Sequence, residues 1–345
     1  MLTKLLAIIL INPPIESDFL TMYQASKMLR VWDLSYTKLD YFINWGYQVG
    51  HVFYKALLLK ICNSVFFLKV VNCLALTGTT ILIYLIVKEL VNEKAAKFTS
   101  LAYTFYLHPV LLTSVLTNQH LPTFLFFLAL YLVIKKDFLK DKPKIKYLIV
   151  GILIAVANIM RPEGIIFILT IIAYLVCICY KSESFKNIFL KILVLLLSYT
   201  IITNGCSFAF KSFNISKNGL NNQDSLWKFV LGTNYDSNGR YNESDLVYLL
   251  NREKELDVIK SRTIKNPIKF SKLMATKAKS FWLDNNLYWS NEYLNNKNLT
   301  ILSKKVSGTK INEYLNALNS QVYIVIFAIA LIGIISLIKI SMTKE

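Results

Sequence analysis

The stretch FFLKVVNCLALTGTTILIYLIV, residues 66–87, decides the fold, and its one charged residue is Lys69. An apolar run of about 20 residues is long enough to cross the roughly 30 Å hydrocarbon core of a membrane as a helix. The composition of the whole chain agrees, since 54% of its 345 residues are hydrophobic and 17% are charged, whereas a soluble domain has about 25% charged residues. The sequence therefore predicts a membrane protein and excludes a disordered chain, a secreted disulfide scaffold and an ordinary cytosolic enzyme.

Similar apolar runs lie on both sides of this stretch. The N-terminal run, residues 2–11, reaches only about 15 Å as a helix, because each residue adds 1.5 Å. We interpret it as the end of a first spanning helix whose beginning lies outside this chain. The predicted fold is an all-α polytopic membrane protein, a bundle of about eight transmembrane helices. The other expected spans are residues 98–116, 121–134, 147–160, 165–180, 189–208 and 322–340.

Short lysine-rich loops set the expected orientation. The net charge is +18, and residues 135–146 alone contain six lysines. Such loops stay in the cytoplasm, so we expect a multi-pass protein of the plasma membrane with both termini cytoplasmic. The predicted division is a transmembrane module at 1–206, with an external juxtamembrane segment at 12–64, then a small, mostly helical external segment at 207–321, and a last span with a cytoplasmic tail at 322–345.

Helical spacing predicts several elements outside the spans. Residues 19–30 follow the capping candidates Ser17 and Asp18, and residues 47–62 have the pattern of a helix lying along the membrane surface. In the external segment we expect one helix at about 244–263 and another that begins with Pro267 at its first position and continues to about residue 282.

The sequence contains no phosphate-binding loop, no dinucleotide-binding glycine motif and no HExxH motif. Its three histidines are not spaced as metal ligands, and the five cysteines suggest neither a metal knuckle nor a disulfide framework. We therefore expect no cofactor and no metal site, although a divalent metal stays possible. The basic residues form no stripe interleaved with aromatic platforms, so we expect no nucleic-acid partner.

Two charged groups are the main candidates for chemistry. Glu16 and Asp18 come directly after the first membrane segment, and an acid held there can act as a general base if it reaches an incoming hydroxyl group; the alternative is that Asp18 only caps the following helix. Arg161 lies between two spans, where a lone arginine is costly and usually faces a polar partner, and its planar fork suits a phosphate. The alternative is an arginine that ends a helix and extends toward water.

Weaker candidates surround these two. Lys69 lies near the external end of its span and can meet an anionic lipid head, with extension toward water as the alternative. His120 belongs to the external loop 117–120, which can line a site beside Asp18, although a solvated polar loop is the commoner outcome.

At these residues the chain resembles the membrane-embedded glycosyltransferases of the GT-C fold, in particular the protein-mannosyltransferase-like and aminoarabinose-transferase-like group, glycosyltransferase family 39 relatives, of low-GC Gram-positive bacteria. The motifs together cover most positions from Pro14 to Trp282. They are Pro14-x-x-x-Asp18-Phe19-x-x-x-Tyr23, Trp45-Gly46-Tyr47-Gln48-Val49-Gly50, Lys69-Val70-Val71-Asn72, Asn158-Ile159-Met160-Arg161-Pro162-Glu163-Gly164, and the run from Gly232 to Asn242.

The resemblance implies a polyprenyl-phosphate-linked sugar as donor, used on the outer face of the membrane, and a hydroxyl group of the cell envelope as acceptor. Asp18 would take the proton of the acceptor, and polyprenyl phosphate would leave with inversion. Arg161 and Lys69 would hold the phosphate, with Tyr23, Glu16, His120 and Gln48 as further substrate-binding candidates. Many relatives place a second acid where this chain has Asn118-Gln119-His120, which leaves a metal role open.

Two other classes of function remain. A non-catalytic polyprenyl-lipid carrier or flippase would also need Arg161 and a lateral groove, but it would not need an external carboxylate base. A cell-envelope assembly or binding protein that retains a degenerate transferase fold is the other alternative. An assay distinguishes the three: a glycosyltransferase transfers the sugar, a carrier or flippase moves the lipid across a vesicle membrane, and an assembly protein only binds.

Overall fold

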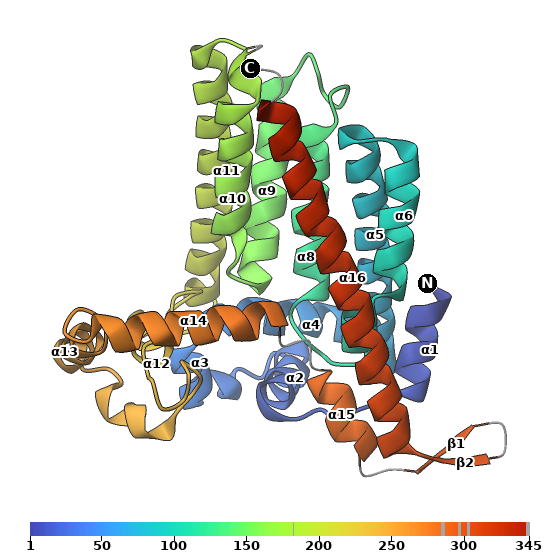
Figure 1. Ribbon diagram of the computed structural model, residues 1–345. Coiled ribbons are helices and arrows are strands. Elements are labelled where there is room, and N and C mark those ends of the chain that lie inside the picture. Colours follow the sequence, from blue (N-terminus) through green and yellow to red (C-terminus); the bar gives the residue numbers. More distant parts are fainter. Residues whose placement is uncertain (182, 284–286, 296–297, 302–303, 343–345) are drawn as a thin grey trace.

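The computed structural model describes residues 1–345 except 182, 284–286, 296–297, 302–303 and 343–345. The described chain is mostly helical (Figure 1), which confirms the predicted all-α polytopic class. Its helices are α1 (Leu2–Leu10), α2 (Ser17–Arg30), α3 (Asp40–Asn44), α4 (Val49–Ile61), α5 (Val65–Leu90), α6 (Glu93–Phe105), α7 (Leu107–Leu112), α8 (His120–Ile134), α9 (Pro143–Met160), α10 (Gly164–Cys177), α11 (Phe185–Ser212), α12 (Trp227–Gly232), α13 (Arg252–Arg262), α14 (Pro267–Leu283), α15 (Tyr288–Asn295) and α16 (Gly308–Met342).

Short 3₁₀ turns and one hairpin complete the described elements. The 3₁₀ turns are η1 (Ser35–Lys38), η2 (Gly46–Gln48), η3 (Cys179–Lys181) and η4 (Glu243–Tyr248). Strands β1 (Asn298–Ile301) and β2 (Lys304–Ser307) pair in antiparallel register just before α16.

Long helices standing side by side form the centre of the molecule (Figure 1). Helix α9 packs against both α8 and α11, and α8 packs in turn against α5. The side chains between these helices are apolar and fully buried, including Phe126, Ile154 and Leu195. Four described helices are long and apolar enough to cross a membrane, namely α5, α9, α11 and the Gly308–Gly333 part of α16, and α8 and α10 are shorter apolar helices.

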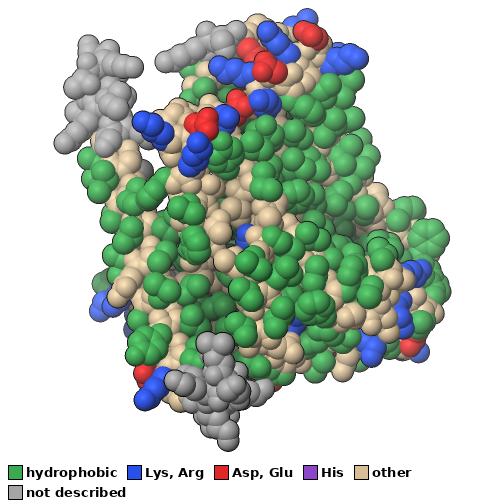
Figure 2. All heavy atoms as spheres, turned by 90° about the vertical axis from the view of Figure 1, so that its right-hand side faces the viewer, with side chains coloured by type: hydrophobic (Ala, Val, Ile, Leu, Met, Phe, Trp, Pro, Cys, Tyr) green, Lys and Arg blue, Asp and Glu red, His purple; other side chains and the backbone are tan. Residues whose placement is uncertain are grey.

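Charged side chains lie mainly at the two ends of this bundle. Figure 2 shows Lys, Arg, Asp and Glu side chains gathered toward the upper and lower ends of one face, with a largely hydrophobic surface between them. Because a bilayer accepts apolar side chains at its centre and charged groups at its borders, this distribution is the one expected of a membrane protein.

The expected span at residues 98–116 is wrong as a single helix, because the chain breaks at Tyr106 into α6 and α7. Tyr106 adopts an extended conformation, with φ −69° and ψ 112°. The following Pro109 accounts for the break, since in a continuous helix its ring would clash with the carbonyl of Phe105 and it has no N–H group to donate there.

The external helix expected at 244–263 is likewise divided, into η4 and α13. Asn251 caps α13, because its side chain accepts a hydrogen bond from the Lys254 N–H. The helix expected to start at Pro267 is confirmed as α14. In Figure 1 it runs across the bundle, just below the lower ends of α9, α10 and α11.

Helices α2 and α4 lie at the lower end of the bundle and pack against each other. Helix α4 also approaches α9 closely at Gly50, where an added Cβ would lie 1.8 Å from the Ile159 carbonyl oxygen. The two helices can therefore approach this closely only because Gly50 has no side chain. The helix expected at 47–62 is observed as α4, but its residues Val52 and Lys55 are buried.

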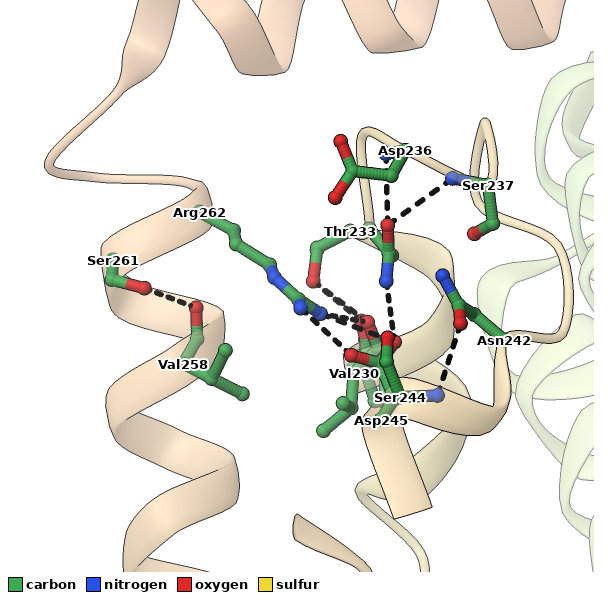
Figure 3. Close-up of polar contacts among 12 residues, drawn as sticks. Val230, Thr233, Asp236, Ser237, Asn242, Ser244, Asp245, Val258, Ser261 and Arg262 are labelled. Carbon is green, nitrogen blue, oxygen red and sulfur yellow. Dashed lines mark hydrogen bonds and ion pairs between the residues drawn. The ribbon is translucent and has the colours of Figure 1, made fainter. Parts of the chain in front are cut away.

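A buried ion pair organises residues 207–321, which we continue to call the external segment after the side of the membrane expected for it (Figure 3). Arg262 on α13 donates to Asp245 at 2.7 Å, and Asp245 is almost fully buried. The Asn234 side-chain amide also donates to Asp245, at 2.8 Å, while its oxygen accepts hydrogen bonds from the backbone of Asp236 and Ser237. These contacts tie the 234–245 turns to α13.

The external segment also docks onto the juxtamembrane segment, through hydrogen bonds to backbone carbonyl groups and a close approach at Gly46. The Gln223 N–H donates to the Asn44 carbonyl at 3.2 Å, and the Asn218 side chain donates to the Ile43 carbonyl at 3.2 Å. A Cβ at Gly46 would lie 2.3 Å from the Asn221 carbonyl oxygen. These contacts hold residues 43–46 next to residues 218–223, far apart in the sequence, beside α2.

Candidate functional site

A cavity of about 730 Å³ lies where α2, the end of α9 and the external segment meet. Asp18 lines it from α2, Gln48 from the end of η2, and Arg161 from its place directly after α9. The loop before α8 contributes Asn118, and the external segment contributes Lys228. The two charged groups singled out from the sequence therefore share one cavity.

Asp18 occupies the first turn of α2 and is exposed to the cavity. Glu16, not Asp18, holds the position before the first helical residue, and no side chain there makes a capping hydrogen bond. The capping alternative for Asp18 therefore has no support in the geometry of α2. A carboxylate in the first turn of a helix is stabilised by the positive end of the helix dipole.

Arg161 is held in place by two neighbours. Its Nε donates to Glu163 at 2.6 Å, and one terminal nitrogen donates to the Asn118 side-chain oxygen at 3.0 Å. The Asn118 amide donates in turn to the Met160 carbonyl at 3.4 Å. The guanidinium group is thus fixed at the cavity wall, and the arginine is not simply extended into water.

Tyr47 lines the same cavity, and the charges of both Asp18 and Arg161 act on it. Burial raises the pKa of Tyr47, the negative charge of Asp18 raises it further, and the positive charge of Arg161 opposes the shift. Tyr47 therefore stays protonated and can donate a hydrogen bond to an anion. Its hydroxyl accepts a hydrogen bond from Gln48 at 3.3 Å.

Tyr41 lies next to this group. Burial and the nearby charge of Asp18 raise its pKa far above the usual value for tyrosine. Its hydroxyl is buried, and within the described residues it makes no hydrogen bond of normal geometry. It therefore offers a protonated donor close to Asp18.

A second cavity, of about 720 Å³, adjoins the first on the side of the external segment. Asp18, Tyr47, Gln48 and Lys228 line both cavities, and Tyr241 lines the second one only. Asp18 therefore lies at the boundary between a cavity that Arg161 lines and a second cavity that Arg161 does not line.

Four other predicted residues lie outside both cavities. Lys69 is buried in α5 and donates to the Asn12 side chain at 2.5 Å. Tyr23 packs beside a buried leucine cluster, and Glu16 is exposed before α2. His120 is buried at the start of α8, and its Nε2 has no hydrogen-bond partner among the described residues. Of the predicted substrate-binding set, Gln48 and Arg161 are the residues that share the Asp18 cavity.

Lys228 and Glu163 are site residues that the sequence did not single out. Glu163 was visible as part of the motif around Arg161, and its acidic side chain next to a lone arginine was the available signal. Lys228 had no local signal, because only the docking of the external segment brings it to Asp18. No group of three or more His, Cys, Asp and Glu side chains arranged to hold a metal ion occurs in the described part of the chain.

Comparison with known proteins gives one match. Residues 50–204, somewhat less than half of the chain, match the family described as dolichyl-phosphate-mannose-protein mannosyltransferase. Neither the curated proteins nor the solved structures contain a match to the chain. The matched range includes Arg161, Asn118 and the helices α5, α8 and α9, and it supports a membrane glycosyltransferase of the GT-C type.

Proposed function

We propose that this protein transfers a sugar from a polyprenyl-phosphate donor to a hydroxyl acceptor on the outer face of the membrane. The observation that carries the proposal is that Asp18 and Arg161 line the same cavity. The family match supports the class of reaction, because its description names a lipid-phosphate-linked sugar. A donor with a hydrocarbon chain and a phosphate group also suits a polar site that lies at one end of an apolar helical bundle.

The chemistry follows from the charges. Asp18 accepts the proton of the acceptor hydroxyl while the hydroxyl oxygen forms a bond to the anomeric carbon of the sugar. The bond from that carbon to the phosphate oxygen breaks on the opposite side, so the configuration inverts. Polyprenyl phosphate leaves with the electron pair of that bond, and Arg161 stabilises the negative charge that develops on the phosphate.

The two adjoining cavities match the two substrates. The donor phosphate belongs in the first cavity, because Arg161 lines it, and the acceptor belongs in the second, which Asp18 also lines but Arg161 does not. Asp18 lines both and is therefore in reach of an acceptor hydroxyl that points toward the donor. The Tyr47 hydroxyl, which stays protonated, can donate to the phosphate or to the sugar.

Purified protein incubated with a radiolabelled polyprenyl-phosphate sugar tests this function. We expect label to appear on an added hydroxyl acceptor, and we expect Asp18→Asn to lower the rate by at least about 100-fold, the range for loss of a general base. Asp40→Asn is the matched control, because Asp40 is an exposed acid on α3 that lines neither cavity.

The alternatives give different results in the same assay. Movement of the labelled lipid across a vesicle without transfer would identify a carrier or flippase, and binding without either would identify a degenerate assembly protein. A transfer rate that Asp18→Asn leaves unchanged would remove Asp18 from the mechanism, even if the protein proves to be a transferase.

A further inference from the structure

Lysine side chains converge on another cavity, at the opposite end of the bundle from Asp18 and Arg161. This cavity, of about 420 Å³, lies where α8 and α10 end and where α9 and α11 begin. These ends of the helices are uppermost in Figure 1. The cavity therefore faces the leaflet on the other side of the membrane from the proposed transfer site.

The lining of this cavity carries a clear excess of positive charge. Lys136, Lys140, Lys146 and Lys191 line it, and Glu183 is the acid among the lining residues. Glu183 is already neutralised, because it forms an ion pair with Lys191. Three lysines of the lining are then left without a compensating carboxylate there.

Lys146 is built into the wall. It is buried, and its ammonium group donates to the Val133 carbonyl at 3.0 Å and to the Lys135 carbonyl at 2.9 Å. An ammonium group has three hydrogens, so these bonds leave one for another acceptor. A buried cation without a countercharge is costly, and an anion in the cavity would relieve that cost.

Lys136 and Lys140 complete the cationic surface. Both are exposed, and neither forms an ion pair with a described residue. The neighbouring Lys135, by contrast, is paired with Glu89 at 2.6 Å. Lys136 and Lys140 are therefore available to an anionic ligand.

The remainder of the lining is apolar. Val133, Ile134 and Ile178 contribute to it, and Ile178 is 60% exposed at the end of α10. The cavity is thus continuous with surface that acyl chains of a bilayer would cover. A ligand that combines a phosphate group with a hydrocarbon chain fits such a lining better than a soluble anion does.

We propose that this cavity binds the phosphate headgroup of an anionic phospholipid from the leaflet on the lysine-rich side. Basic pockets between transmembrane helices on the cytoplasmic side bind headgroups of this kind. The site is separate from the proposed transfer chemistry, so either assignment can fail without the other.

Native mass spectrometry of the full chain with added phosphatidylglycerol tests the proposal. The wild-type protein is expected to retain phosphatidylglycerol in preference to phosphatidylcholine. The double variant Lys136→Gln/Lys140→Gln is expected to bind it about tenfold more weakly, since each lysine near an anionic surface contributes appreciably to binding. The matched control is Lys142→Gln/Lys144→Gln, which removes the same charge from nearby exposed residues, before and at the start of α9, that do not line the cavity.

The proposal is supported if the Lys136→Gln/Lys140→Gln variant loses phosphatidylglycerol while the Lys142→Gln/Lys144→Gln variant retains it. Equal losses in both double variants would overturn it, because they would indicate a diffuse effect of surface charge. Equal retention of phosphatidylcholine by the wild-type protein would also overturn the proposal. Displacement of phosphatidylglycerol by glycerol phosphate at equal concentration would overturn it too, because the ligand would then be a soluble phosphate.

Discussion

The ammonium group of Lys228 lies 4.7 Å from the centre of the Trp45 ring. Lys228 belongs to the external segment and Trp45 to the juxtamembrane segment, so the contact joins the two parts of the chain between which the cavities lie. A cation over the face of a tryptophan is attracted by the ring quadrupole. Lys228 thereby stays beside Asp18, where it lines both cavities.

A double-mutant cycle measures this contact. Lys228→Met and Trp45→Leu, alone and together, are expected to show a coupling free energy of about 1 kcal/mol in the unfolding of the purified protein, the usual size of a cation–π interaction. The same cycle with Lys279→Met in place of Lys228→Met should give a coupling near zero, because Lys279 is exposed on α14. Equal couplings in the two cycles would contradict the proposed contact.

Arg161 can be tested through the kinetics of transfer. Arg161→Gln is expected to lower kcat by about 10²- to 10³-fold, the cost of removing a group that stabilises developing charge. Arg161→Lys keeps the charge but loses the planar fork, and we expect a smaller loss. Arg252→Gln, an exposed arginine at the start of α13 that lines neither cavity, serves as control. A Gln variant as fast as the wild type would exclude Arg161 from the reaction.

Gly50 offers a test of the fold beneath the site. Gly50→Ala places a methyl group against the Ile159 carbonyl, and separating α4 from α9 is expected to cost about 1–3 kcal/mol of unfolding free energy. Gly205→Ala is the matched control, since an added Cβ there meets no heavy atom within 4 Å. It should be neutral or stabilising by up to about 1 kcal/mol. Thermal unfolding of both variants decides whether the close approach is required.

The external segment should respond to pH through Glu255. The pKa of Glu255 is raised from 4.5 to about 7, mainly by burial and also by the adjacent Asp224 carboxylate, while Arg252 opposes the shift. The folded state therefore favours the protonated form. The stabilisation is complete below about pH 4.5 and is lost as the pH rises through about 7.

Resistance of the external segment to proteolysis is the measurement. It should increase as the pH falls from 8 to 5, and Glu255→Gln should abolish most of that dependence. Burial raises the pKa of Asp224, but the hydrogen bonds that it accepts from Glu255 and the backbone outweigh this effect and bring the pKa below 3.8, so its own titration lies below this range. Glu253→Gln, an exposed residue on the same helix, should keep the wild-type dependence.

The sequence predicted the membrane class and most long helices because apolar length is a local property. Apolar length alone could not locate the break at Tyr106, since the run 98–116 contains no Asp, Glu, Lys or Arg and the break follows from the geometry of Pro109. The hairpin of β1 and β2 was missed as well, because its two short strands carry little pattern.

The candidate site was predictable in part. Asp18 and Arg161 were recognisable because an acid and a lone arginine beside apolar runs are unusual, and the cavity contains both. Lys69, which the resemblance also suggested, is engaged with Asn12 and lines neither cavity. Lys228 could not be found from the sequence, because its place depends on the contacts between residues 43–46 and 218–223.

The docking of the external segment at Gly46 has a consequence for biosynthesis. Asp18 and Arg161 leave the ribosome well before Asn221 and Lys228, which line the same cavity. A nascent chain that contains Asp18 and Arg161 but not yet residues 221–228 therefore lacks part of the cavity wall. The cavity can be complete only after the distant residue Asn221 has been synthesised and packs against the backbone of Gly46.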